Sequence, residues 1–180
     1  MKYVEGDLFD NIPEDKSVVI CHVCNDQSKW GSGFVIPLGN KFPLARESYF
    51  AWANNQTLDH EKVSFGTPGR PEFCLGEVQF VRVAPNVTVA NMVAQTLGGE
   101  RPLYYNALSS CMDQVCELTW LKDATTEFLC PMFGSDRAGG TWAFVENLIE
   151  DCWERSGLNV TICYLPQFLP AGWTPPTDPN

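Results

Sequence analysis

The feature that most constrains the fold is an almost unbroken apolar run over residues 17–24, which reads SVVICHVC. A strand with one face in water alternates apolar and polar side chains, whereas a strand buried on both faces is apolar nearly throughout. Such a central strand needs a layer of helices on each side of its sheet. The run therefore favours an α/β domain.

The other segments alternate between strand and helix patterns. Strands are predicted over 2–5, 17–24, 77–83, 87–94, 127–132 and 159–165. Helices are predicted over 34–53, where Pro37 and Pro43 interrupt the pattern, and over the amphipathic segment 101–118. A further helix has an inner face of Trp142, Val145, Leu148, Ile149 and Cys152. This alternation predicts an α/β fold whose mixed, mostly parallel sheet is covered on both faces.

A chain of 180 residues has the length of one ordinary domain, and it shows no internal repeat. We expect a single domain over 1–166, with an irregular, turn-rich insertion at about 55–76. Five of the last fifteen residues are proline. The segment 167–180 is therefore expected to be a tail, either a strap on the domain or a disordered end.

The charge balance bears on partners. Twelve Lys and Arg residues against 22 Asp and Glu residues give a net charge of −10, and no basic run is present. We expect such a chain not to bind nucleic acid non-specifically, because its carboxylates repel the phosphate backbone. No signal peptide or membrane-spanning run is visible. We expect an intracellular monomer that does not bind membranes.

Eight cysteines raise the question of metal. Cys21 and Cys24 have the CxxC spacing of zinc sites. They lie in a predicted strand, where neighbouring side chains point to opposite faces. The chain has no second CxxC, and its only histidines are His22 and His60. We therefore expect these cysteines to be small, buried hydrophobic residues, and we expect no metal and no cofactor.

Three loops that follow predicted strands have residues suited to ligand binding: 6–9 (GDLF), 25–33 and 133–136 (FGSD). Ligands bind open α/β sheets at the carboxyl ends of strands. Glycines let backbone N–H groups approach a ligand closely, and helix N-termini favour anions. Two such loops on neighbouring strands would hold a diphosphate between them, without cationic side chains.

Structural interpretations of the same residues stand beside this one. Asp7 and Asp136 are suited to capping a turn or a helix. His22, inside a buried strand, is equally suited to be a core histidine with its hydrogen bonds satisfied.

Taken in order, these segments resemble the macrodomain family. The resemblance is carried by 4–9 (VEGDLF), 19–25 (VICHVCN), 30–34 (WGSGF), 131–137 (PMFGSDR), 145–149 (VENLI) and 160–165 (VTICYL). It covers the chain apart from the tail and the insertion. It implies a three-layer α/β/α domain that binds ADP-ribose.

Two subgroups of the family are similar in different places. His22, Cys24 and Asn25, followed by Ser28-x-Trp30-Gly-x-Gly, resemble the yeast-type ADP-ribose 1″-phosphate phosphatase. The turn 134–137 more closely resembles the terminal ADP-ribose glycohydrolase, in which a lysine attacks the ribose. Gln95 corresponds to that lysine here, and an amide cannot form the Schiff-base-like adduct that an amine forms.

The resemblance implies a pose for ADP-ribose. Asp7 would accept a hydrogen bond from the adenine amino group, with the Leu8 N–H beside it, and Asn25 would contact the distal ribose. The other implied ligand-binding residues are Trp30, Gly31, Ser32, Gly33, Phe34, Gln95, Gly134, Ser135 and Arg137.

The same resemblance makes His22 the candidate nucleophile or acid–base and lets Asp136 orient a water or the histidine. A histidine pKa near neutrality suits either role. We therefore expect a phosphatase that acts on ADP-ribose 1″-phosphate, by a phosphohistidine or by direct water attack. The alternatives are an ADP-ribose reader without catalysis, a lysine-independent hydrolase of ADP-ribosylated macromolecules that uses Asp136, and a purely structural domain.

Overall fold

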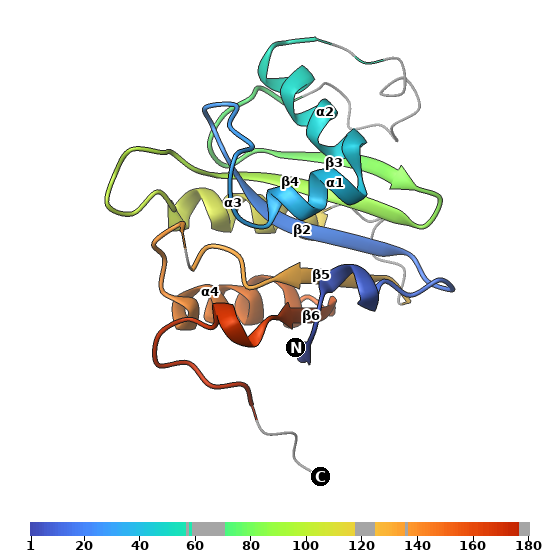
Figure 1. Ribbon diagram of the computed structural model, residues 1–180, viewed down its shortest axis with the longest axis vertical. Coiled ribbons are helices and arrows are strands. Elements are labelled where there is room, and N and C mark those ends of the chain that lie inside the picture. Colours follow the sequence, from blue (N-terminus) through green and yellow to red (C-terminus); the bar gives the residue numbers. More distant parts are fainter. Residues whose placement is uncertain (57, 59–70, 118–124, 136, 177–180) are drawn as a thin grey trace.

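A six-stranded sheet forms the middle of the molecule, in the order β1-β6-β5-β2-β4-β3. The computed structural model describes residues 1–56, 58, 71–117, 125–135 and 137–176. The strands are β1 (Lys2–Glu5), β2 (Val18–Asn25), β3 (Val78–Ala84), β4 (Val87–Gln95), β5 (Glu127–Pro131) and β6 (Asn159–Tyr164). All neighbours pair in parallel except β3 and β4. Figure 1 shows helices on both sides of the sheet, which confirms the predicted three-layer α/β fold.

Strand β2 is central, and seven of its eight residues are buried. Its side chains alternate between two cores. Val19 and Cys21 enter the core on one face of the sheet, whereas Ile20 and Cys24 enter the core on the other. The apolar run therefore reflects two buried faces, as the sequence predicted.

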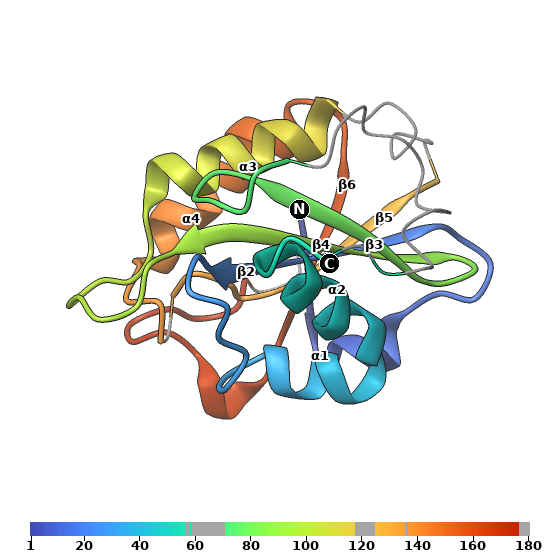
Figure 2. The same cartoon turned by 90° about the horizontal axis from the view of Figure 1, so that it is seen from above.

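One face of the sheet is covered by α1 (Val35–Lys41), α2 (Pro43–Ala53) and the 3₁₀ turn η1 (Leu8–Asn11), as Figure 2 shows. The single helix predicted over 34–53 is two helices that meet at Phe42. Pro43 is the first residue of α2, a position that needs no backbone donor. Pro37 is tolerated because it lies in the first turn of α1.

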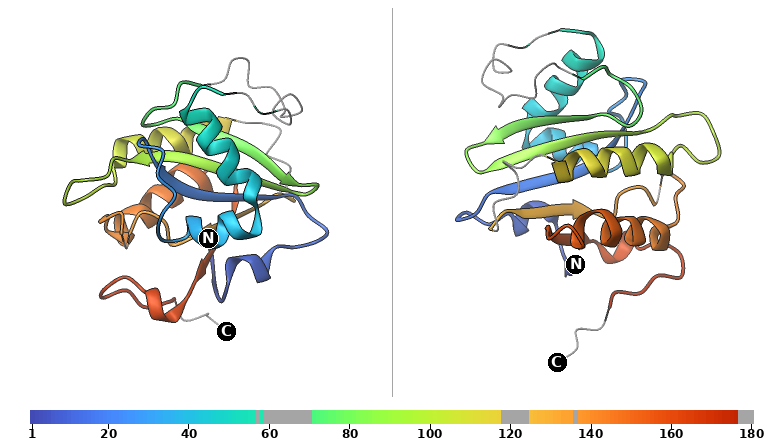
Figure 3. Two further views of the ribbon diagram at one scale, coloured as in Figure 1. Left: turned by 45° about the horizontal axis from the view of Figure 1, so that its top comes forward. Right: turned by 180° about the vertical axis from the view of Figure 1, so that it is seen from behind.

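The opposite face is covered by α3 (Tyr105–Glu117), α4 (Trp142–Ile149) and the π-helical turn η4 (Glu150–Glu154), seen from behind in Figure 3. Helix α3 starts later than the predicted residue 101, because Leu103 forms a β-bridge with Gln95. No helix in the described part of the chain combines the length and hydrophobicity that a membrane crossing requires.

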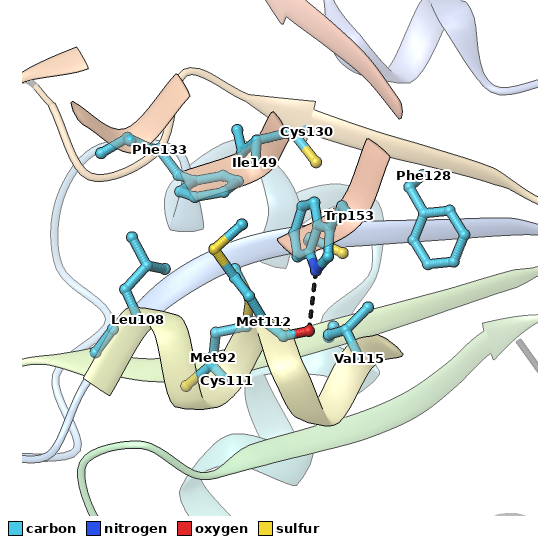
Figure 4. Packing of buried hydrophobic residues seen from close by; sticks show 14 of the residues in the cluster. Met92, Leu108, Cys111, Met112, Val115, Phe128, Cys130, Phe133, Ile149 and Trp153 are labelled. Atoms are coloured by element: carbon cyan, nitrogen blue, oxygen red, sulfur yellow. Dashed lines mark hydrogen bonds between the residues drawn. The ribbon is translucent and has the colours of Figure 1, made fainter. Parts of the chain in front are cut away.

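Trp153 of η4 anchors this second core. Its side chain is fully buried, with ring centroids 6.4 Å from Phe128 and 6.1 Å from Phe133. Its indole N–H donates to the carbonyl of Met112 on α3 at 3.0 Å, the contact drawn in Figure 4. The indole therefore joins η4, α3 and the sheet.

The chain continues after β6 through the 3₁₀ turn η5 (Pro166–Phe168). Trp173 then packs against the rings of Tyr3 and Tyr164, with centroids 5.2 and 5.7 Å apart. As far as it is described, to residue 176, the tail is a strap on the strands β1 and β6. Residues 177–180 and most of the predicted insertion at 55–76 lie outside the described residues.

Replacing Trp153 by alanine should lower the free energy of unfolding by about 3–5 kcal/mol, because a buried aromatic ring and its hydrogen bond are lost. Urea denaturation at 25 °C measures this. Phe168→Ala, at a ring that is 65% exposed, should change the same quantity by no more than about 0.5 kcal/mol. Equal effects of the two substitutions would contradict the assignment of Trp153 to the core.

Candidate functional site

The loops that follow the parallel strands gather at one edge of the sheet. Loop 26–34 follows β2, loop 96–104 follows β4 and loop 132–141 follows β5. Figure 1 shows all three at the left of the molecule. Because β2 pairs with β4 on one side and with β5 on the other, its loop lies between the other two.

Asn25 shapes the first half of the loop after β2. Its Oδ1 accepts hydrogen bonds from the backbone N–H groups of Gln27 (3.1 Å) and Lys29 (3.0 Å), and its Nδ2 donates to the Lys29 carbonyl at 2.8 Å. The Tyr49 hydroxyl, from α2, donates to the Asn25 carbonyl at 2.5 Å. The Asn25 amide, which the resemblance assigned to the distal ribose, is thus engaged in holding its own loop and is only 7% exposed.

The same loop is tied to the loop after β4. The Asp26 N–H donates to the Gln95 carbonyl at 2.9 Å, and the Thr96 hydroxyl donates to Asp26 Oδ2 at 2.9 Å. The Leu97 N–H donates to Gln27 Oε1 at 2.7 Å. The side-chain amide of Gln95 is half-buried and makes no hydrogen bond with a described residue. The binding role that the resemblance implies for Gln95 stays a prediction.

Segment 31–34 forms the second half of the loop after β2. Gly31, Ser32 and Gly33 are exposed, and the N–H groups of 31–34 have no acceptor among the described residues. Gly33 has a φ of 75°, which glycine adopts without strain. Helix α1 has only seven residues and no side-chain cap, so the expected contribution of its N-terminus to anion binding is small. Free loop N–H groups are the stronger feature.

The loop after β5 is built on a similar glycine turn. Gly134 has a φ of 77°, and its carbonyl accepts a hydrogen bond from the Gly140 N–H at 2.9 Å. A side-chain carbon on Gly140 would lie 2.2 Å from that carbonyl oxygen, so the turn requires glycine there. The Ser135 hydroxyl is buried and donates to the Met132 carbonyl at 3.1 Å. The candidate catalytic residue Asp136 lies outside the described residues.

The loop after β5 reaches the loop after β2 through the side chain of Arg137. A side-chain carbon on Gly33 would lie 3.9 Å from Cδ of Arg137, so the second loop extends its side chain to the backbone of the first. Arg137 is exposed, and its guanidinium makes no ion pair with a described residue. A guanidinium without a partner among the described residues thus lies beside N–H donors that also lack one there, in a chain whose net charge is −10.

The turn after β1 reaches the same loop through aromatic rings. Asp7 is exposed and caps η1 by accepting a hydrogen bond from the Phe9 N–H at 2.9 Å, whereas Leu8 is buried. Phe9 stacks on Phe34 with ring centroids 5.7 Å apart and planes 7° from parallel. Asp7 therefore has the structural role of a cap, and it is Phe9, two residues later, that contacts Phe34 of segment 31–34.

His22 lies beneath the loop rather than on its surface. It is 1% exposed, and its Nε2 is 2.6 Å from Oδ1 of Asn91 on β4. Its ring centroid lies 5.6 Å from that of Trp30 and 5.9 Å from that of Phe34. Burial lowers the pKa of the imidazole to about 4, so the ring is neutral at pH 7. His22 meets the exposed part of the loop only through these aromatic neighbours.

Trp30 supports the loop from below. Its indole is 8% exposed and packs against His22 and against Tyr49, whose ring centroid is 5.3 Å away. Gly39 of α1 lets it approach closely, because a side-chain carbon there would lie 2.7 Å from Nε1. The side chain of Trp30 therefore belongs to the core, and its backbone begins the exposed segment.

The CxxC pair does not form a metal site. Cys21 and Cys24 lie in different cores, on opposite faces of the sheet. Within the described residues, no three His, Cys, Asp or Glu side chains are placed to hold a metal ion.

Comparisons with known proteins agree with this arrangement. No protein-family model matches the chain. A solved macrodomain protein from Streptomyces coelicolor is 33% identical in sequence, with a TM-score of 0.69 over 90% of this chain and 97% of its own. The chain belongs to the macrodomain family. A protein from Bacteroides thetaiotaomicron is 31% identical, with a TM-score of 0.75 over 92% of this chain and 99% of its own.

More distant or partial matches add to the comparison. A curated ADP-ribose 1″-phosphate phosphatase from Lodderomyces elongisporus is 34% identical over 58 residues, which are 32% of this macrodomain and 36% of that protein. The chain thus spans little more than a third of the length of the curated relatives it matches. Thermosipho africanus DarTG, solved in complex with ADP-ribose, shares the fold at 14% identity, with a TM-score of 0.64 over 92% of this chain and 42% of its own.

Three residues that support the site carried no sequence signal. Tyr49 looks like an ordinary core position of α2, and Gln27 and Thr96 look like ordinary loop residues. Their roles depend on partners 24 to 70 positions away along the chain, since Tyr49 bonds Asn25, Gln27 bonds Leu97 and Thr96 bonds Asp26. Sequence spacing cannot reveal such pairs.

The depressed pKa of His22 predicts a pH dependence of stability. Between pH 6.5 and 4 the unfolded chain binds a proton at this position that the folded macrodomain does not. The free energy of unfolding is therefore highest above pH 6.5 and falls as the pH is lowered through this range. We expect a loss of about 2 kcal/mol between pH 7 and pH 5. Urea denaturation across this range measures it.

Two glutamine variants separate His22 from the rest of the chain. In His22→Gln the free energy of unfolding should depend less on pH than in the parent protein. His60→Gln, at the other histidine of the sequence, should retain the pH dependence of the parent. An unchanged slope in His22→Gln would show that the imidazole is not held neutral in the folded state.

Proposed function

We propose that this macrodomain binds ADP-ribose at the carboxyl edge of its sheet, with the diphosphate between segment 31–34 and loop 132–141. The ligand class is supported by the names of the curated relatives, which are ADP-ribose 1″-phosphate phosphatases, and by the solved complex of DarTG with ADP-ribose. The chemistry of the two loops supports the same class.

One observation carries the proposal, namely the juxtaposition of Gly33 and Arg137. An acidic protein repels a diphosphate unless donors are concentrated where the anion binds. Unpaired N–H groups from segment 31–34 and the Arg137 guanidinium supply such donors together, and a guanidinium can bind phosphate oxygens in a bidentate manner. The diphosphate is therefore the part of the ligand that the site recognises most strongly.

The two ends of the ligand follow from the loops on either side. Asp7 and the Leu8 N–H, in the turn whose Phe9 stacks on Phe34, would bind the adenine. The terminal ribose would lie toward β4, where the free amide of Gln95 is available. Ser135 would contribute its backbone N–H rather than its hydroxyl, because the hydroxyl is already bonded within the turn.

A second candidate function is removal of a phosphate from the terminal ribose, which the names of the yeast relatives favour. In that reaction a nucleophile attacks phosphorus, the P–O bond to the ribose breaks, and the ribose oxygen takes a proton. A buried, neutral His22 is poorly suited to donate that proton. We propose that His22 is a positioning residue that supports Phe34 and Trp30. Water would then attack the phosphorus directly, and Asp136 would orient that water.

Arg137→Ala should weaken ADP-ribose binding about tenfold, which corresponds to about 1.4 kcal/mol, because a cation at the diphosphate is lost. Isothermal titration calorimetry with ADP-ribose measures the change. The matched control is Arg155→Ala, which removes the same charge from an exposed residue that precedes β6, at the opposite edge of the sheet.

The control should leave the affinity within about twofold, since its charge is screened at that distance. Similar losses in the two variants would mean that net charge, and not the placement of Arg137, governs binding. An unaltered chain that gives no heat with ADP-ribose would overturn the proposed function itself.

The role of His22 can be tested by release of inorganic phosphate from ADP-ribose 1″-phosphate. If His22 positions the loop, His22→Asn, which keeps a polar partner for Asn91, should retain at least about a tenth of the turnover, whereas His22→Ala should lose more through the cavity it leaves. A His22→Asn protein that folds and binds ADP-ribose but shows no turnover would instead support a phosphohistidine mechanism.

A further inference from the structure

Lys29 is an exposed lysine whose side chain has no role in the site as described so far. Its backbone is fixed on both sides, because its N–H donates to Asn25 and its carbonyl accepts from Asn25. The Tyr49 hydroxyl holds Asn25 in turn. The ammonium group makes no ion pair with a described carboxylate. A free cation on a flexible stem is thus presented from a loop whose backbone is held in place.

The order of the strands places the loop that contains Lys29 beside the proposed position of the terminal ribose. Asp7 follows β1, the glycine turns follow β5 and β2, and Gln95 ends β4. Neighbouring strands are about 4.8 Å apart, so four spacings put the ends of β1 and β4 about 19 Å apart. If Asp7 receives the adenine and the glycine turns receive the diphosphate, the terminal ribose extends toward β4. Lys29 lies on that side, in the loop that is tied to Gln95 and Leu97.

The other charges at this end are few. The loops 26–34 and 96–104 contain two basic residues, Lys29 and Arg101, and two acidic ones, Asp26 and Glu100. The Asp26 carboxylate already accepts from the Thr96 hydroxyl. The guanidinium of Arg101 lies over the ring of Tyr105, 4.7 Å from its centroid. Lys29 is therefore the cation available to an anionic group on the terminal ribose.

We propose that Lys29 binds a phosphate carried by the terminal ribose, so that the site prefers ADP-ribose 1″-phosphate to ADP-ribose. The inference rests on the proposed ADP-ribose site and goes further by naming the residue that selects the phosphorylated ligand. A phosphomonoester adds negative charge to a ligand of a protein whose net charge is −10. A compact ammonium on a flexible stem suits a phosphate at the rim of a site, where no fixed bidentate geometry is imposed.

The test compares two ligands, ADP-ribose and ADP-ribose 1″-phosphate, by calorimetric titration of the full chain. If the phosphorylated ligand is turned over, its KM replaces the dissociation constant. Lys29→Gln should weaken binding of ADP-ribose 1″-phosphate about tenfold, while binding of ADP-ribose stays within about twofold. Lys29→Arg, which keeps the charge, should restore most of the preference for ADP-ribose 1″-phosphate over ADP-ribose. Higher salt should reduce this preference in the unaltered chain.

The matched control is Lys41→Gln, which removes the same charge from the exposed last residue of α1 and should change neither affinity. If Lys29→Gln weakens both ligands equally, or neither, the inference is overturned. An unaltered chain that binds both ligands equally well overturns the inference alone. An unaltered chain that binds neither overturns the proposed function and the inference with it.

Discussion

The site depends on the parallel pairing of β2 with β5 on one side and β4 on the other. Parallel pairing brings the carboxyl ends of the three strands to one edge, so their loops are neighbours although they are far apart in sequence. The burial of β2 on both faces stabilises this arrangement, because any shift of register by one residue would exchange the side chains of its two cores. Each contact between the loops follows from this pairing.

Within that frame, the loop after β2 is held from below and from the side. Aromatic rings and His22 support it from the core, and the Asn25 side chain folds its first half. The motif that resembles the phosphatase subgroup is therefore largely a supporting structure in this macrodomain. His22 and Asn25 of this motif are hydrogen-bonded within the protein. In the part of the chain that the structure describes, the groups of this edge without a partner are backbone donors and a few side chains at the rim.

The charge distribution explains how an acidic macrodomain would hold an anionic ligand. A net charge of −10 opposes binding at long range, whereas donors concentrated at the edge act on the ligand at short range. Arg137 beside Gly33 and Lys29 toward β4 are separate cations, suited to separate phosphates. Recognition of the diphosphate and selection of a terminal phosphate would thus depend on different residues.

The sequence alone determined the α/β class, the strand segments to within a residue or two, and the loops that form the edge, because burial period and glycine turns are local properties of the chain. Tertiary structure decided which groups in those loops are free. Spacing in the sequence could not show that the Asn25 amide hydrogen-bonds its own loop, or that His22 is buried and bonded to Asn91. Nor could it show that Tyr49 and Thr96 hold the loops at this edge. Hydrogen-bond partners and burial depend on segments that meet only after folding, and these decide which polar groups can still bind a ligand.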